Sequence, residues 1–216
     1  MMTRDQALAA VKVGDIIYGI AAEQKPKLLL VYEADEAGFS ARHITSQTIA
    51  KFGRDGEAWW TPDGGNCTIV STAALPPEQY QVAFALDRRM GTKPEYPDSR
   101  LTEDEIQLIL KHDEFFEQRL LPGTETLVQR AQKLRAIGSI LTLDWDPSDA
   151  KENPSSLFEY DGYLPELLDL LEKRAAQDDV AHFLADMAAR RNRAQIVRER
   201  TEDAAASLVQ LRESWR

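Results

Sequence analysis

The residues best suited to chemistry lie in two short segments of the C-terminal half, Leu143–Pro147 and Glu159–Tyr163. Together these segments hold four carboxylates and three large aromatic side chains. Carboxylates bind a hard cation or transfer protons when the fold holds two or more of them within a few ångströms. The spacing is not that of a calcium loop, because the glycine and the closing glutamate of such a loop are absent. We therefore predict a structural role, with Trp145 and Tyr163 as core aromatics and Asp146 in a turn.

The same segments and the C-terminal tail supply the candidate binding residues. The tail ends in an apolar stripe with i, i+3, i+7 spacing, which can pack on the body of the chain or on another chain. The binding candidates are Trp145, Asp146, Glu159, Asp161, Tyr163, Leu208, Leu211 and Trp215. A weaker alternative is a cation site, which needs at least three of Asp144, Asp146, Glu159 and Asp161 within reach of one point. Our expectation is that the chain uses no metal and no cofactor.

Histidine and cysteine give little sign of a catalytic or metal site. His43, His112 and His182 lie far apart in the sequence, and none has a second His or Cys at metal-ligand spacing. We expect them to be solvated or to lie at the edge of the core. Cys67 is the single cysteine, so we predict a small buried thiol rather than a disulfide or a nucleophile.

Composition and charge narrow the class of protein and of partner. The chain has 216 residues, of which 43% are hydrophobic, so a packed core is expected. The net charge of −10 is uneven: residues 1–97 carry −2 and residues 98–216 carry −8. This acidity disfavours a nucleic-acid partner, because phosphates need a basic surface. The absence of a long apolar run or a secretory signal predicts a cytoplasmic protein with no membrane contact. We expect a protein partner or self-association.

Short apolar runs separated by turns predict a β-rich N-terminal half. Thr3 is expected to cap a short helix that reaches about Val11. Strands are predicted at 16–20, 28–32, 39–44, 68–71 and 81–86. Apolar and polar residues alternate at 39–44, so a hairpin between this strand and the strand at 28–32 is the clearest β-structure signal in the sequence. Short strands at this spacing are typical of a small barrel or a strongly bent sheet.

A proline-containing stretch without apolar periodicity, Gly91–Ser99, precedes a helical half. Thr102 and Glu105 have the spacing of a capping box. Helices are predicted from there to residue 120 and over 124–138, 157–173 and 178–191, whereas 140–143 fits a strand or a helix end. The fold class is therefore α+β. We expect an SH3-like barrel domain at 1–92, a linker at 93–99, a helical domain at 100–200 and a charged helical tail at 201–216.

Four pieces of the N-terminal half resemble the PemK/MazF family of small barrel proteins, which includes toxin ribonucleases. These pieces are Val13–Ile17, Lys25–Val31, Ile44–Gln47 and Leu86–Arg89, spread over about residues 13–90. The resemblance implies a barrel that binds or cleaves RNA, with Lys25, Thr45, Ser46 and Arg88 as the candidate catalytic residues. An arginine normally stands where this chain has Lys25. Lysine keeps the charge but lacks the planar fork that clamps a phosphate, so this departure weighs against nuclease activity.

The C-terminal half resembles a small bacterial helical family of uncharacterised function, over about residues 125–190. The matching motifs are Trp-Asp-Pro at Trp145–Pro147 and Glu-Tyr-Asp-x-Tyr at Glu159–Tyr163. This resemblance implies a fold module and no activity.

Two interpretations of the function follow. The first is a non-enzymatic protein-interaction module of antitoxin or immunity type, based on the acidic helical half and the apolar stripe. The alternative is a PemK/MazF-like RNA-binding or RNA-cleaving protein, which as an enzyme would be an endoribonuclease. The alternative requires Lys25, Thr45, Ser46 and Arg88 to converge in one groove.

Overall fold

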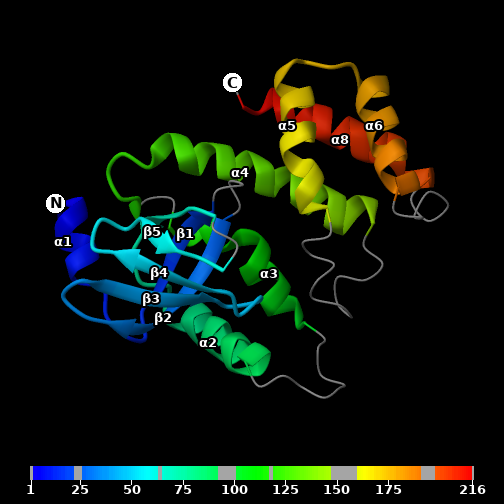
Figure 1. Cartoon of the computed structure of the whole chain (residues 1–216). Helices are drawn as coiled ribbons and strands as arrows, with labels where there is room; N and C mark the ends of the chain where they lie inside the picture. The colour runs from blue at the N-terminus through cyan, green and yellow to red at the C-terminus, as the bar shows by residue number, and fades with distance from the viewer. Residues whose placement is uncertain are drawn as a thin grey trace. The chain divides into compact units, whose positions relative to one another are not determined.

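The computed structural model describes residues 2–21, 26–62, 65–91, 101–116, 119–146, 160–190 and 198–215. The chain divides into two compact units, Met1–Gln132 and Lys133–Arg216. The division falls within helix α4 (Glu125–Ser139) (Figure 1). The linker predicted at 93–99 lies outside the described residues.

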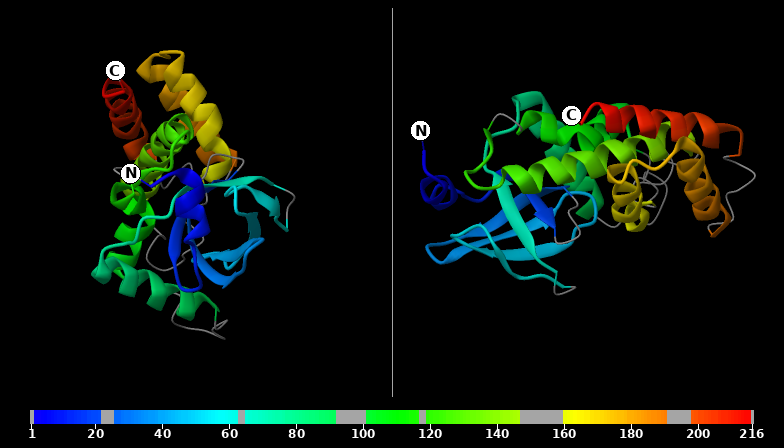
Figure 2. Two further views of the ribbon diagram at one scale, coloured as in Figure 1. Left: turned by 90° about the vertical axis from the view of Figure 1, so that its left-hand side faces the viewer. Right: turned by 90° about the horizontal axis from the view of Figure 1, so that it is seen from above.

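The first unit is built on one curled antiparallel sheet. Its elements are α1 (Arg4–Ala9), β1 (Ile16–Ala21), β2 (Pro26–Ala34), β3 (Gly38–His43), β4 (Ile49–Gly53), β5 (Ala58–Trp60), β6 (Cys67–Ser71), α2 (Pro77–Gly91), α3 (Glu103–Lys111) and the 3-10 turn η1 (His112–Phe115). The strand order is β5-β4-β3-β2-β1-β6, and the curl of the sheet is visible in Figure 2. The two ends of the sheet meet at a bridge between Glu57 and Thr68. This half-barrel, followed by helices, confirms the predicted α+β class with a bent N-terminal sheet.

The β2–β3 hairpin that the sequence predicted is present. Its register pairs Leu30 with Arg42 and Val31 with Ala41. Gly38 begins β3 at a point where a Cβ atom would lie 2.1 Å from the carbonyl oxygen of Phe52, so no larger residue fits there.

The inside of the curl forms the apolar core of the first unit. Its buried members are Ala7, Leu8, Val11, Ile17, Leu29, Val31, Phe39, Ala41, Ala50, Phe52, Cys67, Ile69 and Leu121. Helix α1 contributes Leu8, and this helix begins with the expected cap. The Thr3 hydroxyl accepts from the Gln6 amide at 3.2 Å, and the Gln6 side chain accepts from the Thr3 amide at 3.0 Å.

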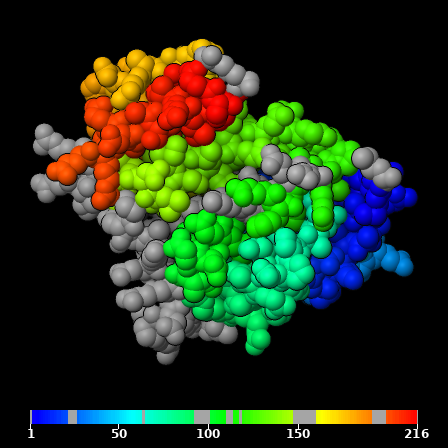
Figure 3. All heavy atoms as spheres, turned by 180° about the vertical axis from the view of Figure 1, so that it is seen from behind, coloured from blue at the N-terminus to red at the C-terminus, as the bar shows by residue number. Residues whose placement is uncertain are grey.

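Helices α2 and α3 lie side by side in the first unit (Figure 3). The strand predicted at 81–86 is wrong, because this segment lies within α2. Ala83, Leu86 and Asp87 are its buried positions, at helical spacing. The five consecutive apolar residues at 82–86 fit a strand period of 2 as well as a helix period of 3.6, which explains the error. The predicted capping box at the start of α3 is confirmed, since Glu105 accepts from the Thr102 amide at 2.7 Å and its own amide donates to the Thr102 hydroxyl at 3.3 Å.

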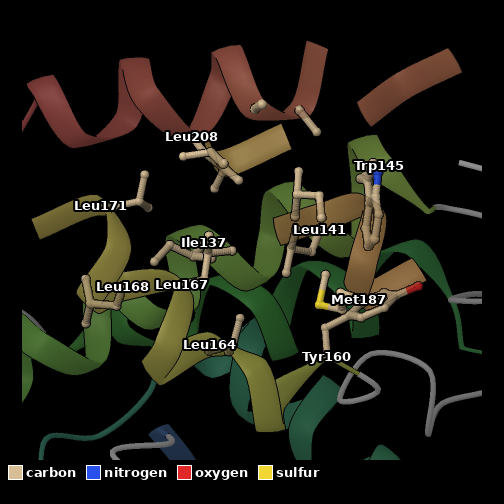
Figure 4. Packing of buried hydrophobic residues seen from close by; sticks show 14 of the residues in the cluster. Ile137, Leu141, Trp145, Tyr160, Leu164, Leu167, Leu168, Leu171, Met187 and Leu208 are labelled. Carbon is tan, nitrogen blue, oxygen red and sulfur yellow. The ribbon is translucent and has the colours of Figure 1, made fainter. Parts of the chain in front are cut away.

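The second unit is helical. After the last residues of α4 come the π-helical turn η3 (Ile140–Trp145), η5 (Asp161–Tyr163), α5 (Leu164–Glu172), α6 (Gln177–Arg190), η6 (Arg198–Arg200) and α8 (Thr201–Glu213). Segment 140–143, which the sequence left open, is therefore helical. Leu141, Leu167, Leu184 and Leu208 from four different elements are fully buried in one shared core, part of which Figure 4 shows. Among the described residues, no helix has the length and apolar character that crossing a membrane requires.

Candidate functional site

The most exposed aromatic side chains of the described residues lie on the edge strand β5. Trp59 is 68% exposed and Trp60 is 44% exposed. Ile49 on the neighbouring strand β4 is 36% exposed. Large apolar side chains at a surface are candidates for a binding site when they lie together, whereas scattered ones are ordinary.

A β-bulge brings the two tryptophans to one side of the sheet. Phe52 pairs with Ala58 and Lys51 pairs with Trp60, so one residue of β4 spans two residues of β5, with Trp59 as the extra one. Adjacent residues of a regular strand point to opposite faces, but a bulge re-aims a side chain. Phe52 is buried in the core and Ala58 packs against it, which leaves Lys51, Trp59 and Trp60 on the outer side.

Lys51 holds its charge at the centre of this group. Its Nζ atom lies 5.7 Å from the ring centroid of Trp59 and 5.9 Å from that of Trp60. Both distances are within the range of a cation–π interaction. Ile49 lies two residues before Lys51 on the same strand and therefore on the same face. We call Ile49, Lys51, Trp59 and Trp60 the tryptophan patch.

The tryptophan patch has the features of a binding surface. It offers two flat apolar surfaces and one ammonium group. Tryptophan is enriched among the residues that dominate protein interfaces, because it buries a large area at little entropic cost. The motifs and spacings considered in the sequence did not predict this patch. The signal was the pair Trp59–Trp60 itself, since two consecutive tryptophans in a half-buried strand place at least one ring outside.

Thr45 and Ser46 lie in the turn that joins β3 to β4. The Ser46 hydroxyl lies 2.8 Å from Nδ1 of His43 and 2.9 Å from the Thr48 hydroxyl. Burial, with a smaller contribution from the charge of Lys27, lowers the pKa of His43 to about 3. The imidazole is therefore neutral and a weak base, so this arrangement fits a hydrogen-bonded turn better than an activated nucleophile.

An ion pair joins this turn region to α2. The Arg42 Nε and Nη2 atoms donate to the two carboxylate oxygens of Asp87 at 2.8 and 2.6 Å. Asp87 is fully buried, and Gln47 Nε2 also donates to its Oδ1 at 3.1 Å. The hydrogen bond to Asp87 raises the pKa of Arg42 above its ordinary value. Two of the segments from which the sequence predicted a PemK/MazF-like barrel, Ile44–Gln47 and Leu86–Arg89, are thus in contact.

The remaining candidates from that resemblance do not join this contact among the described residues. Arg88 is exposed on α2, next to Asp87 in sequence but outside its hydrogen bonds. Its neighbour Arg89 pairs with Glu105 of α3 at 2.5 Å. Lys25 lies outside the described residues, so convergence of the four candidate catalytic residues stays a prediction.

In the second unit, the residues around Trp145 are part of a buried network. The Trp145 and Tyr160 side chains both lie in the core of this unit (Figure 4), with ring centroids 5.4 Å apart and an interplanar angle of 56°. The Trp145 Nε1 donates to the Thr201 hydroxyl at 3.2 Å. The Tyr160 hydroxyl donates to the carboxylate of Asp146, which is also buried. These contacts tie η3 to η5 and α8.

The other binding candidates of this unit lie at or near the same core. Leu208 is buried, and Leu211 and Trp215 are partly buried against the core. The Nζ atom of Lys133 lies 5.0 Å from the Trp215 ring centroid. Tyr163 is also partly buried against this core, Asp161 is partly exposed, and Glu159 lies outside the described residues. The tail stripe therefore packs on its own unit.

No group of three or more His, Cys, Asp or Glu side chains among the described residues is arranged to hold a metal ion. Asp144 is exposed, whereas Asp146 is buried beside Tyr160. The cation site considered from the sequence also needs Glu159, which the structure does not describe.

Comparison with family models, with curated proteins and with solved structures gives no match to this chain.

Proposed function

We propose that this chain is a non-enzymatic protein-interaction module that binds its partner through the tryptophan patch. The observation that supports this proposal is the exposure of Trp59 and Trp60 on one side of an edge strand, held there by a β-bulge. Binding hot spots are enriched in tryptophan.

The sequence also predicted the apolar stripe of the C-terminal tail as an interaction surface, but the packing of this stripe favours the tryptophan patch instead. Leu208 is fully buried in the second unit, and Leu211 and Trp215 pack against its core. Their apolar area is already used in folding. The tryptophan patch is instead open to a partner, and an antitoxin- or immunity-type binder is one form that such a module takes.

Affinity capture from the native host tests this function. We expect the wild-type chain to retain a stoichiometric partner that the double variant Trp59→Ser/Trp60→Ser does not retain. Val13→Ser is the matched control, because Val13 is another apolar side chain of the first unit and is 59% exposed. Equal retention by the double variant, or no stoichiometric partner for the wild type, would overturn the proposal.

The RNA-binding or RNA-cleaving alternative has one observation in its favour. The turn that holds Thr45 and Ser46 is joined to α2 through Gln47 and Asp87, which brings together two of the segments that carry the PemK/MazF resemblance. Its test is incubation of RNA with the wild type, Lys25→Ala and Ser46→Ala. Cleavage that both substitutions abolish supports this alternative, whereas equal cleavage by all three proteins discredits the roles of these residues.

A further inference from the structure

The tryptophan patch lies in a part of the sheet that has no negative charge of its own. Strands β3, β4 and β5 contain no Asp or Glu. Their charged side chains are Arg42 and Lys51, and the charge of Arg42 is balanced by Asp87. His43 is neutral because its pKa is lowered to about 3. Lys51 therefore provides the unbalanced charge of these three strands.

The charged groups between β4 and β5 cancel one another, because Arg54 and the exposed Asp55 next to it carry opposite charges and Glu57 is paired with Arg4. Glu57, just before β5, pairs with Arg4 at 3.4 Å and accepts from the Thr68 hydroxyl at 2.6 Å. Arg54, just after β4, donates to backbone carbonyls of Leu8 and Val11 at 2.7 and 3.2 Å. Because salt screens exposed charges beyond roughly 8 Å, a ligand at the patch responds to Lys51 more than to the net charge of the chain.

The backbone beside the patch can also take part in binding. Strand β5 ends the sheet, and its bridge to β6 lies at Glu57, before the two tryptophans. Past that bridge, no described strand pairs with the outer edge of Trp59 and Trp60. An edge of this kind accepts an extended peptide as a further strand, with side-chain contacts giving the specificity.

We propose that the tryptophan patch binds an extended acidic peptide segment of another protein. A carboxylate of the segment pairs with Lys51, and its apolar side chains lie on the rings of Trp59 and Trp60 and on Ile49. This inference rests on the proposed function and adds the chemistry of the partner. A single-stranded nucleic acid also stacks on aromatic rings, but it needs a track of several cations, and the patch supplies one.

Selection from a random dodecapeptide phage library tests the inference directly. The targets are the wild type, Lys51→Glu, and Trp59→Ser/Trp60→Ser, each checked for folding by circular dichroism and thermal unfolding. Lys12→Glu is the matched control, since it reverses the charge of an exposed lysine of the same unit outside the patch.

We expect the wild type and Lys12→Glu to select peptides rich in Asp or Glu beside apolar residues. Lys51→Glu should weaken binding of those peptides by at least about tenfold and select basic peptides instead, because like charges in contact are strongly unfavourable. The double tryptophan variant should select neither class.

The outcomes separate the inference from the proposed function. Peptides that depend on the tryptophans but bind Lys51→Glu as well as they bind the wild type would overturn the inference and leave the function standing. Failure to select any peptide that depends on the tryptophans would overturn the inference, and the affinity capture would then decide the proposed function by itself. Binding of a dodecamer of uridine that depends on the tryptophans, in the absence of such peptides, would replace the protein partner with a nucleic acid.

Discussion

The ion pair between Arg42 and Asp87 allows a quantitative test of how the turn after β3 is held to α2. Asp87 is 0% exposed and accepts from Arg42 at 2.8 and 2.6 Å and from Gln47 at 3.1 Å. Replacing Arg42 by leucine leaves a buried carboxylate with the Gln47 amide as its remaining side-chain donor among these contacts. Removal of one partner of a buried pair costs about 3–5 kcal/mol. Because the Arg42 side chain is 32% exposed, we expect the lower end of that range, about 3 kcal/mol.

Replacing Asp87 should lower the free energy of unfolding by less than replacing Arg42 does. Asp87→Leu leaves the Arg42 guanidinium, which can turn toward water, so we expect a loss of about 1–2 kcal/mol. The double variant Arg42→Leu/Asp87→Leu removes both charges and should cost less than the sum of the two single variants, with a coupling of about 2 kcal/mol.

Cys67 provides an assay that reports on the first unit alone. It is the single cysteine of the chain and is buried in the core of that unit. The rate of thiol labelling across a urea series therefore gives the free energy of opening of the first unit, even when the second unit unfolds separately. A cost below about 1 kcal/mol for Arg42→Leu, or strict additivity in the double variant, would refute the reasoning.

Three further predictions follow from the buried groups. Burial raises the pKa of Cys67 to about 12, so a thiol reagent at pH 8 should label the native protein far more slowly than the denatured protein; equal rates would contradict the burial. The folded-state pKa of His43, about 3, lies below its unfolded value near 6.5. The unfolded state therefore binds a proton first, and stability falls as pH drops from about 6.5 toward 3, by at most about 1.4 kcal/mol per pH unit. His43→Gln should reduce this loss of stability, as measured by urea titrations at pH 7 and pH 5. An unchanged loss would show that protonation of His43 is not its cause. His182→Gln is the control for the removal of an imidazole elsewhere in the chain. Tyr160→Phe removes a donor from the buried Asp146 carboxylate and should cost about 1–3 kcal/mol of second-unit stability, measured by near-UV circular dichroism during unfolding; an unchanged midpoint would contradict it.

Local signals allowed much of the secondary structure to be predicted. The cap at Thr3 and the capping box at Thr102 depend on contacts between residues three apart, so they can be predicted from the sequence. The β2–β3 hairpin is similar, because alternation and a short turn specify it locally. The sequence wrongly predicts a strand at 81–86 within helix α2, because the short apolar run there fits the strand period and the helix period equally well.

The candidate sites show the same division between local and long-range information. The sequence pointed to Trp145 and to the tail stripe, and the structure places Trp145 and Leu208 in the core of the second unit. It did not point to Trp59 and Trp60. Their exposure depends on the register between β4 and β5, where a bulge opposite Lys51 and Phe52 turns both rings outward.

The sequence by itself determined the α+β class, the helix caps and the central hairpin, because each rests on interactions among neighbouring residues. Only the tertiary structure decided which apolar residues are used in folding and which stay exposed. That choice depends on pairings between segments far apart in the chain, such as Arg42 with Asp87, Trp145 with Thr201, and Glu57 with Thr68. No local pattern specifies these pairings, since they depend on the combined packing of the whole unit.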